Sequence, residues 1–139
     1  MTRIILTVLA ATLFAAGALA QTDPSYPFLE KAYEALRRAD YDTAIPAFEQ
    51  AAKLAPRLPS IRKDLAYTLL KVGENNRARE QFAEAMRLDP GDAHVALEYA
   101  FLCYETKQEV EARRVFLKYH ETDATAAQAD RKSTRLNSS

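Results

Sequence analysis

A period of 34 residues is the feature of this sequence that most limits how the chain can fold. Six positions in the stretch Pro59–Asp92 carry residues that also occur 34 positions earlier, and three of these columns continue 34 positions later. The central set is Ala66, Ala78, Phe82, Ala85, Leu88 and Pro90, preceded by Ala32, Ala44, Phe48, Ala51, Leu54 and Pro56 and followed by Ala100, Ala112 and Phe116. The frame needs no insertion or deletion. Self-similarity at this period predicts a helical repeat array.

Each unit divides into two helical halves. The apolar spacing and the breakers between the halves predict six helices, over residues 27–38, 41–54, 59–72, 75–88, 93–106 and 108–121. Ala55-Pro56 and Pro90-Gly91 end the second helices, because proline cannot continue the backbone ladder and glycine permits the turn. Asp40 and Asn75 are predicted N-caps. Pro46 falls about one turn inside a predicted helix, so we expect a local bend or a late helix start there.

The order of small residue, small residue, aromatic, small residue and proline resembles the tetratricopeptide repeat family. Units 25–58 and 59–92 carry the whole pattern, whereas unit 93–126 carries part of it, with Tyr119 at the usual alanine and Ala124 at the usual proline. The resemblance implies an all-α fold, a right-handed α-solenoid of about three helix-turn-helix repeats stacked on a shared core.

The two ends of the chain lie outside the repeat frame. Residues 1–20 have a basic start, an apolar stretch and a small-x-small end, which predicts a secretory signal peptide cleaved after Ala20. We therefore expect an exported, periplasmic or secreted protein without a stable membrane span after cleavage; an uncleaved anchor is the alternative. Residues 21–24 are a linker. Residues 127–139 are expected to be a disordered or non-native tail. Within it, residues 131–139 resemble translated sequencing adapter, so we expect the natural chain to be longer.

Composition argues against several functions. The formal net charge is zero, so it implies neither a nucleic-acid partner nor an anionic membrane surface. Three glycines leave no phosphate-binding loop, and His94 and His120 have no neighbouring metal-ligand pattern. We expect no cofactor, no metal and no catalytic residues, so the chain is not expected to be an enzyme. Cys103, the single cysteine, is expected to be a buried, inert residue.

The family resemblance implies that the first helices of successive repeats line a concave groove. Corresponding positions on that frame form rows, of which the aromatic row Tyr33, Tyr67 and Phe101 is the main candidate for partner binding. The alternative is that these rings only pack against neighbouring first helices. The full set of predicted partner-binding residues is Leu29, Tyr33, Leu36, Lys63, Tyr67, Leu70, His94, Leu97, Phe101 and Tyr104.

One version of the family grips a partner's C-terminal carboxylate with lysine and asparagine residues on this inner face. Among the matching positions here, Lys63 is the only compatible cation, and the others are mainly apolar or aromatic. A helix or an extended peptide that docks through apolar side chains fits this pattern better.

The sequence therefore predicts a non-catalytic protein–protein interaction scaffold of the cell envelope, which binds a protein or peptide partner in the groove. Two alternatives stay open. The chain is the N-terminal segment of a larger, truncated envelope assembly or export protein, or it is the regulatory array of a missing catalytic domain. Sequencing the gene beyond the codon for Asp130 distinguishes them.

Overall fold

The computed structural model describes residues 23–121, and the predicted signal peptide and tail lie outside them. The described chain is all helical and contains no strand. The helices are α1 (Tyr26–Arg37), α2 (Tyr41–Leu54), α3 (Pro59–Lys71), α4 (Asn75–Leu88), α5 (Ala93–Glu105) and a sixth helix over residues 109–121. The bounds of α1 to α5 agree with the predicted ones to within one residue at either end, and the sixth helix begins one residue later than predicted.

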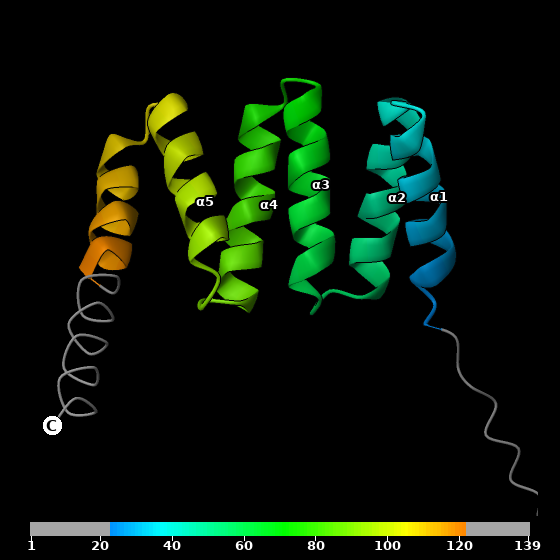
Figure 1. The fold of residues 1–139 in the computed structure, drawn as a ribbon, viewed down its shortest axis with the longest axis horizontal. Helices are drawn as coiled ribbons and strands as arrows, with labels where there is room; N and C mark the ends of the chain where they lie inside the picture. Colours follow the sequence, from blue (N-terminus) through cyan, green and yellow to red (C-terminus); the bar gives the residue numbers. More distant parts are fainter. Residues whose placement is uncertain (1–22, 122–139) are drawn as a thin grey trace, which may run out of the picture.

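The helices lie side by side in sequence order, and successive helices run in opposite directions (Figure 1). Extensive packing joins each helix to the next one along the chain, from α1 with α2 through α4 with α5. This neighbour-to-neighbour stacking is the arrangement of an α-solenoid. The all-α helical repeat fold predicted from the 34-residue period is confirmed.

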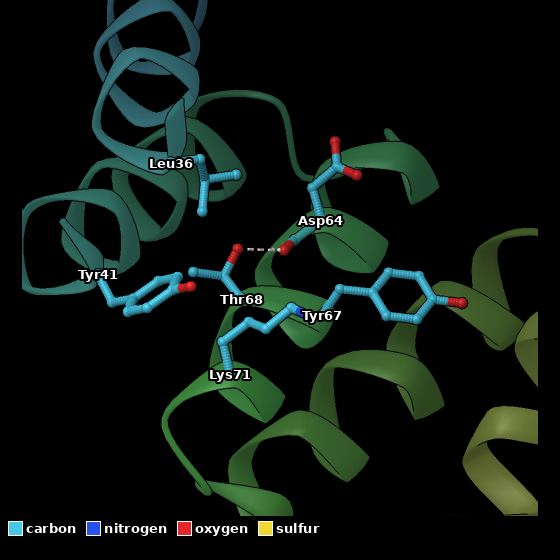
Figure 2. A pocket seen from close by; sticks show the side chains of 6 residues that line it. All are labelled: Leu36, Tyr41, Asp64, Tyr67, Thr68 and Lys71. Atoms are coloured by element: carbon cyan, nitrogen blue, oxygen red, sulfur yellow. Dashed lines mark hydrogen bonds between the residues drawn. The ribbon is translucent and has the colours of Figure 1, made fainter. Parts of the chain in front are cut away.

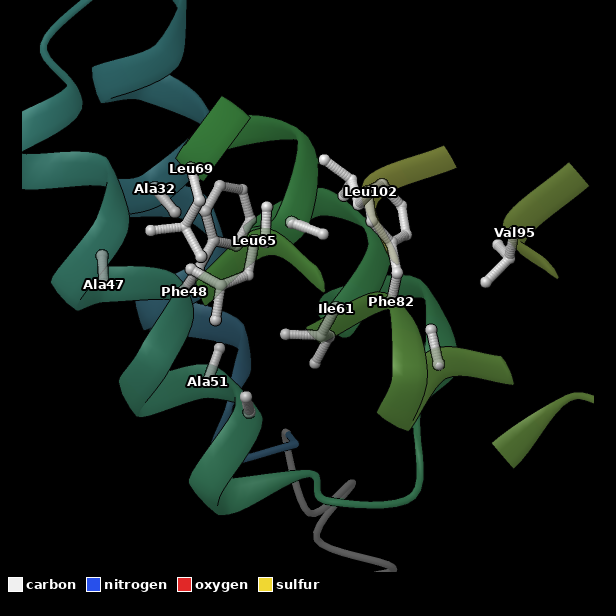
Figure 3. Close-up of a cluster of buried hydrophobic side chains, with 14 residues drawn as sticks. Ala32, Ala47, Phe48, Ala51, Ile61, Leu65, Leu69, Phe82, Val95 and Leu102 are labelled. Carbon is white, nitrogen blue, oxygen red and sulfur yellow. The ribbon is translucent and has the colours of Figure 1, made fainter. Parts of the chain in front are cut away.

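Small residues and two phenylalanines form the core between the helices. Phe48 and Phe82 are fully buried, as are Ala32, Ala66 and Ala100. Phe48 lies beside Leu65 and Leu69, and Phe82 lies beside Leu102 of the next repeat (Figure 3). The alanine positions let the helices approach one another, and the phenylalanines fill the space between successive pairs.

Phe116 departs from this pattern. The period predicts the same buried role as for Phe48 and Phe82, but 38% of Phe116 is exposed. The physical reason is its place in the array, because no further described helix follows the sixth one to cover its ring. The prediction that Phe116 fills the core is therefore wrong for the described chain.

The helix caps are only partly as predicted. Asp40 caps α2, since its Oδ1 accepts a hydrogen bond from the Thr43 backbone N–H at 3.1 Å. Asn75 is not a cap: it is the first residue of α4, and the N-cap is Glu74, which makes no side-chain capping bond. Glu74, not Asn75, occupies the repeat position of Asp40, and this shift by one residue explains the error.

Pro46 lies inside a continuous helix. α2 begins at Tyr41, which excludes a late helix start, and the alternative of a local bend stays a prediction. The ring of Pro46 is exposed, which keeps it out of the packed face of the helix.

The turn inside each repeat uses a left-handed residue at the same repeat position. The φ angles are 56° at Ala39, 77° at Gly73 and 66° at Lys107. Glycine adopts this conformation without a Cβ clash, whereas alanine and lysine adopt it at a cost of about 1–2 kcal/mol. The second repeat therefore has an unstrained turn and the other two do not.

Replacing Ala39 by glycine is expected to increase the free energy of unfolding by about 0.5–1 kcal/mol, because relief of strain exceeds the added freedom of the unfolded chain. Gly73→Ala is the matched opposite change and is expected to lower the free energy of unfolding. The added Cβ would meet no heavy atom within 4 Å, so only the strain of the left-handed backbone opposes the alanine. Urea denaturation measures both. Shifts of the same sign in the two variants would contradict the explanation.

Candidate functional site

The predicted partner-binding residues lie along α1, α3 and α5, and we call the surface that they form the first-helix face. Its exposed apolar side chains are concentrated towards the third repeat, where Leu97 is 43%, Phe101 57% and Tyr104 61% exposed. Tyr33 is 40% exposed and His94 is also exposed. The half-buried members are Leu29, Leu36, Lys63, Tyr67 and Leu70.

Tyr33 and Tyr67 connect the core to this face in the same way. The ring of Tyr33 packs edge-on against Phe48 with centroids 5.2 Å apart, and Tyr67 packs against Phe82 at 4.9 Å. Each tyrosine thus packs one edge of its ring on a buried phenylalanine and leaves part of the ring accessible. Packing and surface exposure therefore coexist in these two rings, and their role in binding stays a prediction.

The tyrosine hydroxyls reach the first helix of the following repeat. Tyr33 Oη donates a hydrogen bond to Asp64 Oδ2 on α3. Tyr67 Oη lies 3.0 Å from His94 Nε2 on α5, and Glu98 Oε1 lies 3.7 Å from the same nitrogen. These contacts tie the first helices together across the face. Phe101 has no hydroxyl and makes no equivalent link.

Nearby carboxylates affect both tyrosines. Burial, followed by the hydrogen bond to Asp64 and its charge, raises the pKa of Tyr33 to about 12. Burial also raises the pKa of Tyr67, with further contributions from Glu98, Asp92 and Asp64. Both hydroxyls therefore stay protonated at neutral pH, and the surroundings of the row are negative.

A row of acids beside the aromatic row was missed by the sequence analysis. Glu30, Asp64 and Glu98 occupy one repeat position, and each lies three residues before a member of the aromatic row. On a helix, residues three apart are neighbours on one face. The 34-residue period was the signal that identifies this row, because it relates the three acids as it relates the three rings.

Lys63 is already engaged within the array. Its Nζ lies 2.9 Å from Asp92 Oδ2, and this bond, with the Val95 backbone N–H, lowers the pKa of Asp92. Asp92 also caps α5, because its Oδ1 accepts a hydrogen bond from the Val95 backbone N–H at 3.1 Å. The single cation at a carboxylate-gripping position is thus part of an ion pair within the array.

A cleft of about 220 Å³ opens between the first repeat and α3 (Figure 2). Thr68 Oγ1 donates to the Asp64 carbonyl oxygen at 2.6 Å within it, and the Tyr67 ring extends away from Leu36 (Figure 2). Its lining residues are Leu36, Tyr41, Asp64, Tyr67, Thr68 and Lys71. Of these, the sequence predicted only Leu36 and Tyr67 as site residues.

A second cleft lies at the C-terminal end of the described array. It measures about 340 Å³ and is mainly apolar, lined by Ala93, Leu97, Phe116, Leu117, Tyr119 and His120. Leu97 is the one predicted site residue that it contains. Leu97 and Leu117 in its lining are exposed to solvent, at 43% and 58%.

No group of three or more His, Cys, Asp or Glu residues within residues 23–121 is placed to hold a metal ion. Cys103 is fully buried, as predicted, and burial raises the pKa of its thiol, which disfavours the reactive thiolate. None of the helices in this part of the chain is long and apolar enough to cross a membrane.

Comparison with known families agrees with the helix pairs and their spacing. The sequence profile described as tetratricopeptide repeat matches residues 35–85 and 69–136, which together make up well over half of the chain. The chain belongs to the tetratricopeptide repeat family. No curated protein matches this tetratricopeptide repeat chain.

Solved structures share the tetratricopeptide repeat fold at low sequence identity. A mutant of MamA aligns with a TM-score of 0.61 and 24% identity over 73% of this chain and 74% of the MamA chain. A second MamA structure aligns with a TM-score of 0.62 and 19% sequence identity, over 66% of this chain and 50% of that MamA chain. The second TPR of Spaghetti (RPAP3), bound to an HSP90 peptide, aligns with a TM-score of 0.58 and 14% sequence identity, over 66% of this chain and 85% of that chain. These likenesses show the fold alone.

Proposed function

We propose that this tetratricopeptide repeat chain is a non-catalytic scaffold of the cell envelope that binds a protein or peptide partner on its first-helix face. The observation that carries the proposal is the row of rings at one repeat position, with Phe101 and its neighbour Tyr104 more than half exposed. Aromatic side chains give large contact area at small entropic cost and are enriched at binding surfaces. Nucleic acid and cofactors have no part in this function.

Two structural neighbours support the class of partner. The RPAP3 repeat domain is bound to a peptide of HSP90, and another neighbour is the CopN-Scc3 complex, which aligns with a TM-score of 0.59 at 16% identity over 66% of this chain and 54% of that chain. Tetratricopeptide repeats are generally non-catalytic interaction modules. The location in the envelope rests on the signal peptide predicted over residues 1–20, which would deliver the protein to the periplasm or the exterior.

The double substitution Phe101→Ser and Tyr104→Ser tests the proposal. Both rings are largely exposed, so the fold should keep its helicity, which circular dichroism checks. We expect partner capture by crosslinking in the envelope fraction of the native host to fall by about tenfold or more, as for central aromatic anchors of an interface.

Val110→Ser is the matched control, because Val110 is 87% exposed but lies on the sixth helix, away from the first-helix face. Capture should be unchanged in this variant. Unchanged capture in the double variant would place the binding surface elsewhere on the array.

A further inference from the structure

We infer that the partner segment docked on the first-helix face is cationic as well as apolar, with lysine or arginine side chains interspersed among hydrophobic ones. This inference rests on the proposed function and adds the chemistry of the partner. It is carried by two features of one surface: the exposed aromatic strip, and the carboxylates that run beside it.

The aromatic strip gives the apolar contact. Tyr33, Phe101 and Tyr104 present between 40% and 61% of their surface to solvent, and they come from the first and third repeats. Tyr67 connects them through the second repeat. A ligand that covers this strip must cross three helices, so it is an extended or helical chain segment and not a small molecule.

Glu30, Asp64 and Glu98 give the charge complementarity. Each repeat places one carboxylate three residues before its ring, so a row of acids runs beside the row of rings across the face. A carboxylate accepts about four hydrogen bonds, and the single bond from Tyr33 leaves Asp64 able to accept others. Lysine and arginine can therefore pair with the acids and also lie over the rings as cations.

The cations of the same helices do not cancel this pattern. Lys63 forms an ion pair with Asp92 at 2.9 Å, and His94 lies 3.7 Å from Glu98. Arg62 donates a hydrogen bond to Gln81 on α4, and Lys31 lines a cleft with residues of α2, so both extend towards the second helices. Arg37 and Lys71 occupy the last turns of α1 and α3, where the third repeat has Glu105 instead. Positive charge is thus at one edge of the face, and the middle, along the rings, is negative. An acidic peptide or an anionic lipid surface would be repelled there.

Selection of peptides from a random display library on the immobilised full chain tests the inference. We expect the selected sequences to be enriched in lysine or arginine together with leucine or aromatic residues. The opposite result would be acidic or uncharged peptides that compete with one another and that no longer bind the Phe101→Ser, Tyr104→Ser variant. This result would overturn the inference that the partner is cationic, but it would support binding on the first-helix face. Failure to select any peptide that depends on these two rings would count against both proposals.

Charge-neutralising variants provide the second arm, measured by titration with the selected peptides. Glu30→Gln, Asp64→Asn and Glu98→Gln together should weaken binding by about tenfold or more, since each exposed ion pair contributes a few-fold. The salt dependence of the dissociation constant should fall as well. A control with the same change of net charge is Glu74→Gln, Glu80→Gln and Glu109→Gln, at exposed positions off the face. Equal weakening in both triple variants would mean that general attraction, and not docking on the acid row, explains the binding.

Discussion

Replacing Phe82 by alanine is expected to lower the free energy of unfolding by roughly 3–5 kcal/mol. The side chain is fully buried between the second and third repeats, and its ring packs edge-on against Tyr67 at 4.9 Å. Its loss removes apolar burial and also opens a cavity that the surrounding helices fill only in part. Because domains of this size are stable by only about 5–15 kcal/mol, urea denaturation should show a large shift or a chain that is already unfolded.

Phe116→Ala is the matched control for this prediction. Phe116 occupies the same repeat position, but it is 38% exposed and has no described helix beyond it. We expect a loss of about 1–2 kcal/mol, because less apolar area is buried and removal of a partly exposed ring leaves no closed cavity. If Phe82→Ala loses no more stability than Phe116→Ala, the position of a phenylalanine within the array does not decide its contribution, contrary to our account of the core.

Enlarging Ala66 to leucine is expected to lower the free energy of unfolding by about 1–3 kcal/mol. Ala66 has no exposed surface, and its equivalents Ala32 and Ala100 are buried to the same degree. The methyl side chain lets neighbouring helices approach, so a leucine must push them apart or adopt a strained rotamer. Thermal and urea unfolding followed by circular dichroism measure the effect.

Ala93→Leu serves as the comparison, because Ala93 is exposed at the first position of α5. This change should alter stability by less than about 0.5 kcal/mol, as is usual for surface positions. An Ala66→Leu variant as stable as the original chain would show that the space around the alanine column is not closely packed.

The fold was predictable from the sequence because one rule repeats. A buried phenylalanine and its alanines at a fixed spacing specify the helix pairs, and breakers such as Pro56 and Pro90 specify where the pairs end. The two errors arise where the repeat is imperfect. Phe116 keeps the residue type of its column but lacks a described neighbour to cover it, and the cap of α4 is Glu74 although Asn75 is the better capping residue.

The candidate site was less predictable. The aromatic row was predicted from the 34-residue period. The hydrogen bond from Tyr33 to Asp64 depends on how closely α1 approaches α3, and the periodicity of a single helix does not contain this distance. The acid row has the same period but was missed, because acidic residues on a helix surface are usually part of a solvated polar face and do not by themselves mark a site. The cleft that contains Thr68 forms where the second repeat stacks on the first, and the cleft that contains Phe116 forms between the two helices of the third repeat. Both depend on contacts between helices, so no local sequence pattern marks them.

Contact between chain neighbours alone gives this molecule a modular surface. Because α2 meets α3 and α4 meets α5 through equivalent packing, one helix pair can be gained or lost without a new kind of interface. Each added pair of the same type would extend the first-helix face by one ring and one acid. On the proposed function, the length of the docked segment would then grow stepwise while its chemical character stays constant.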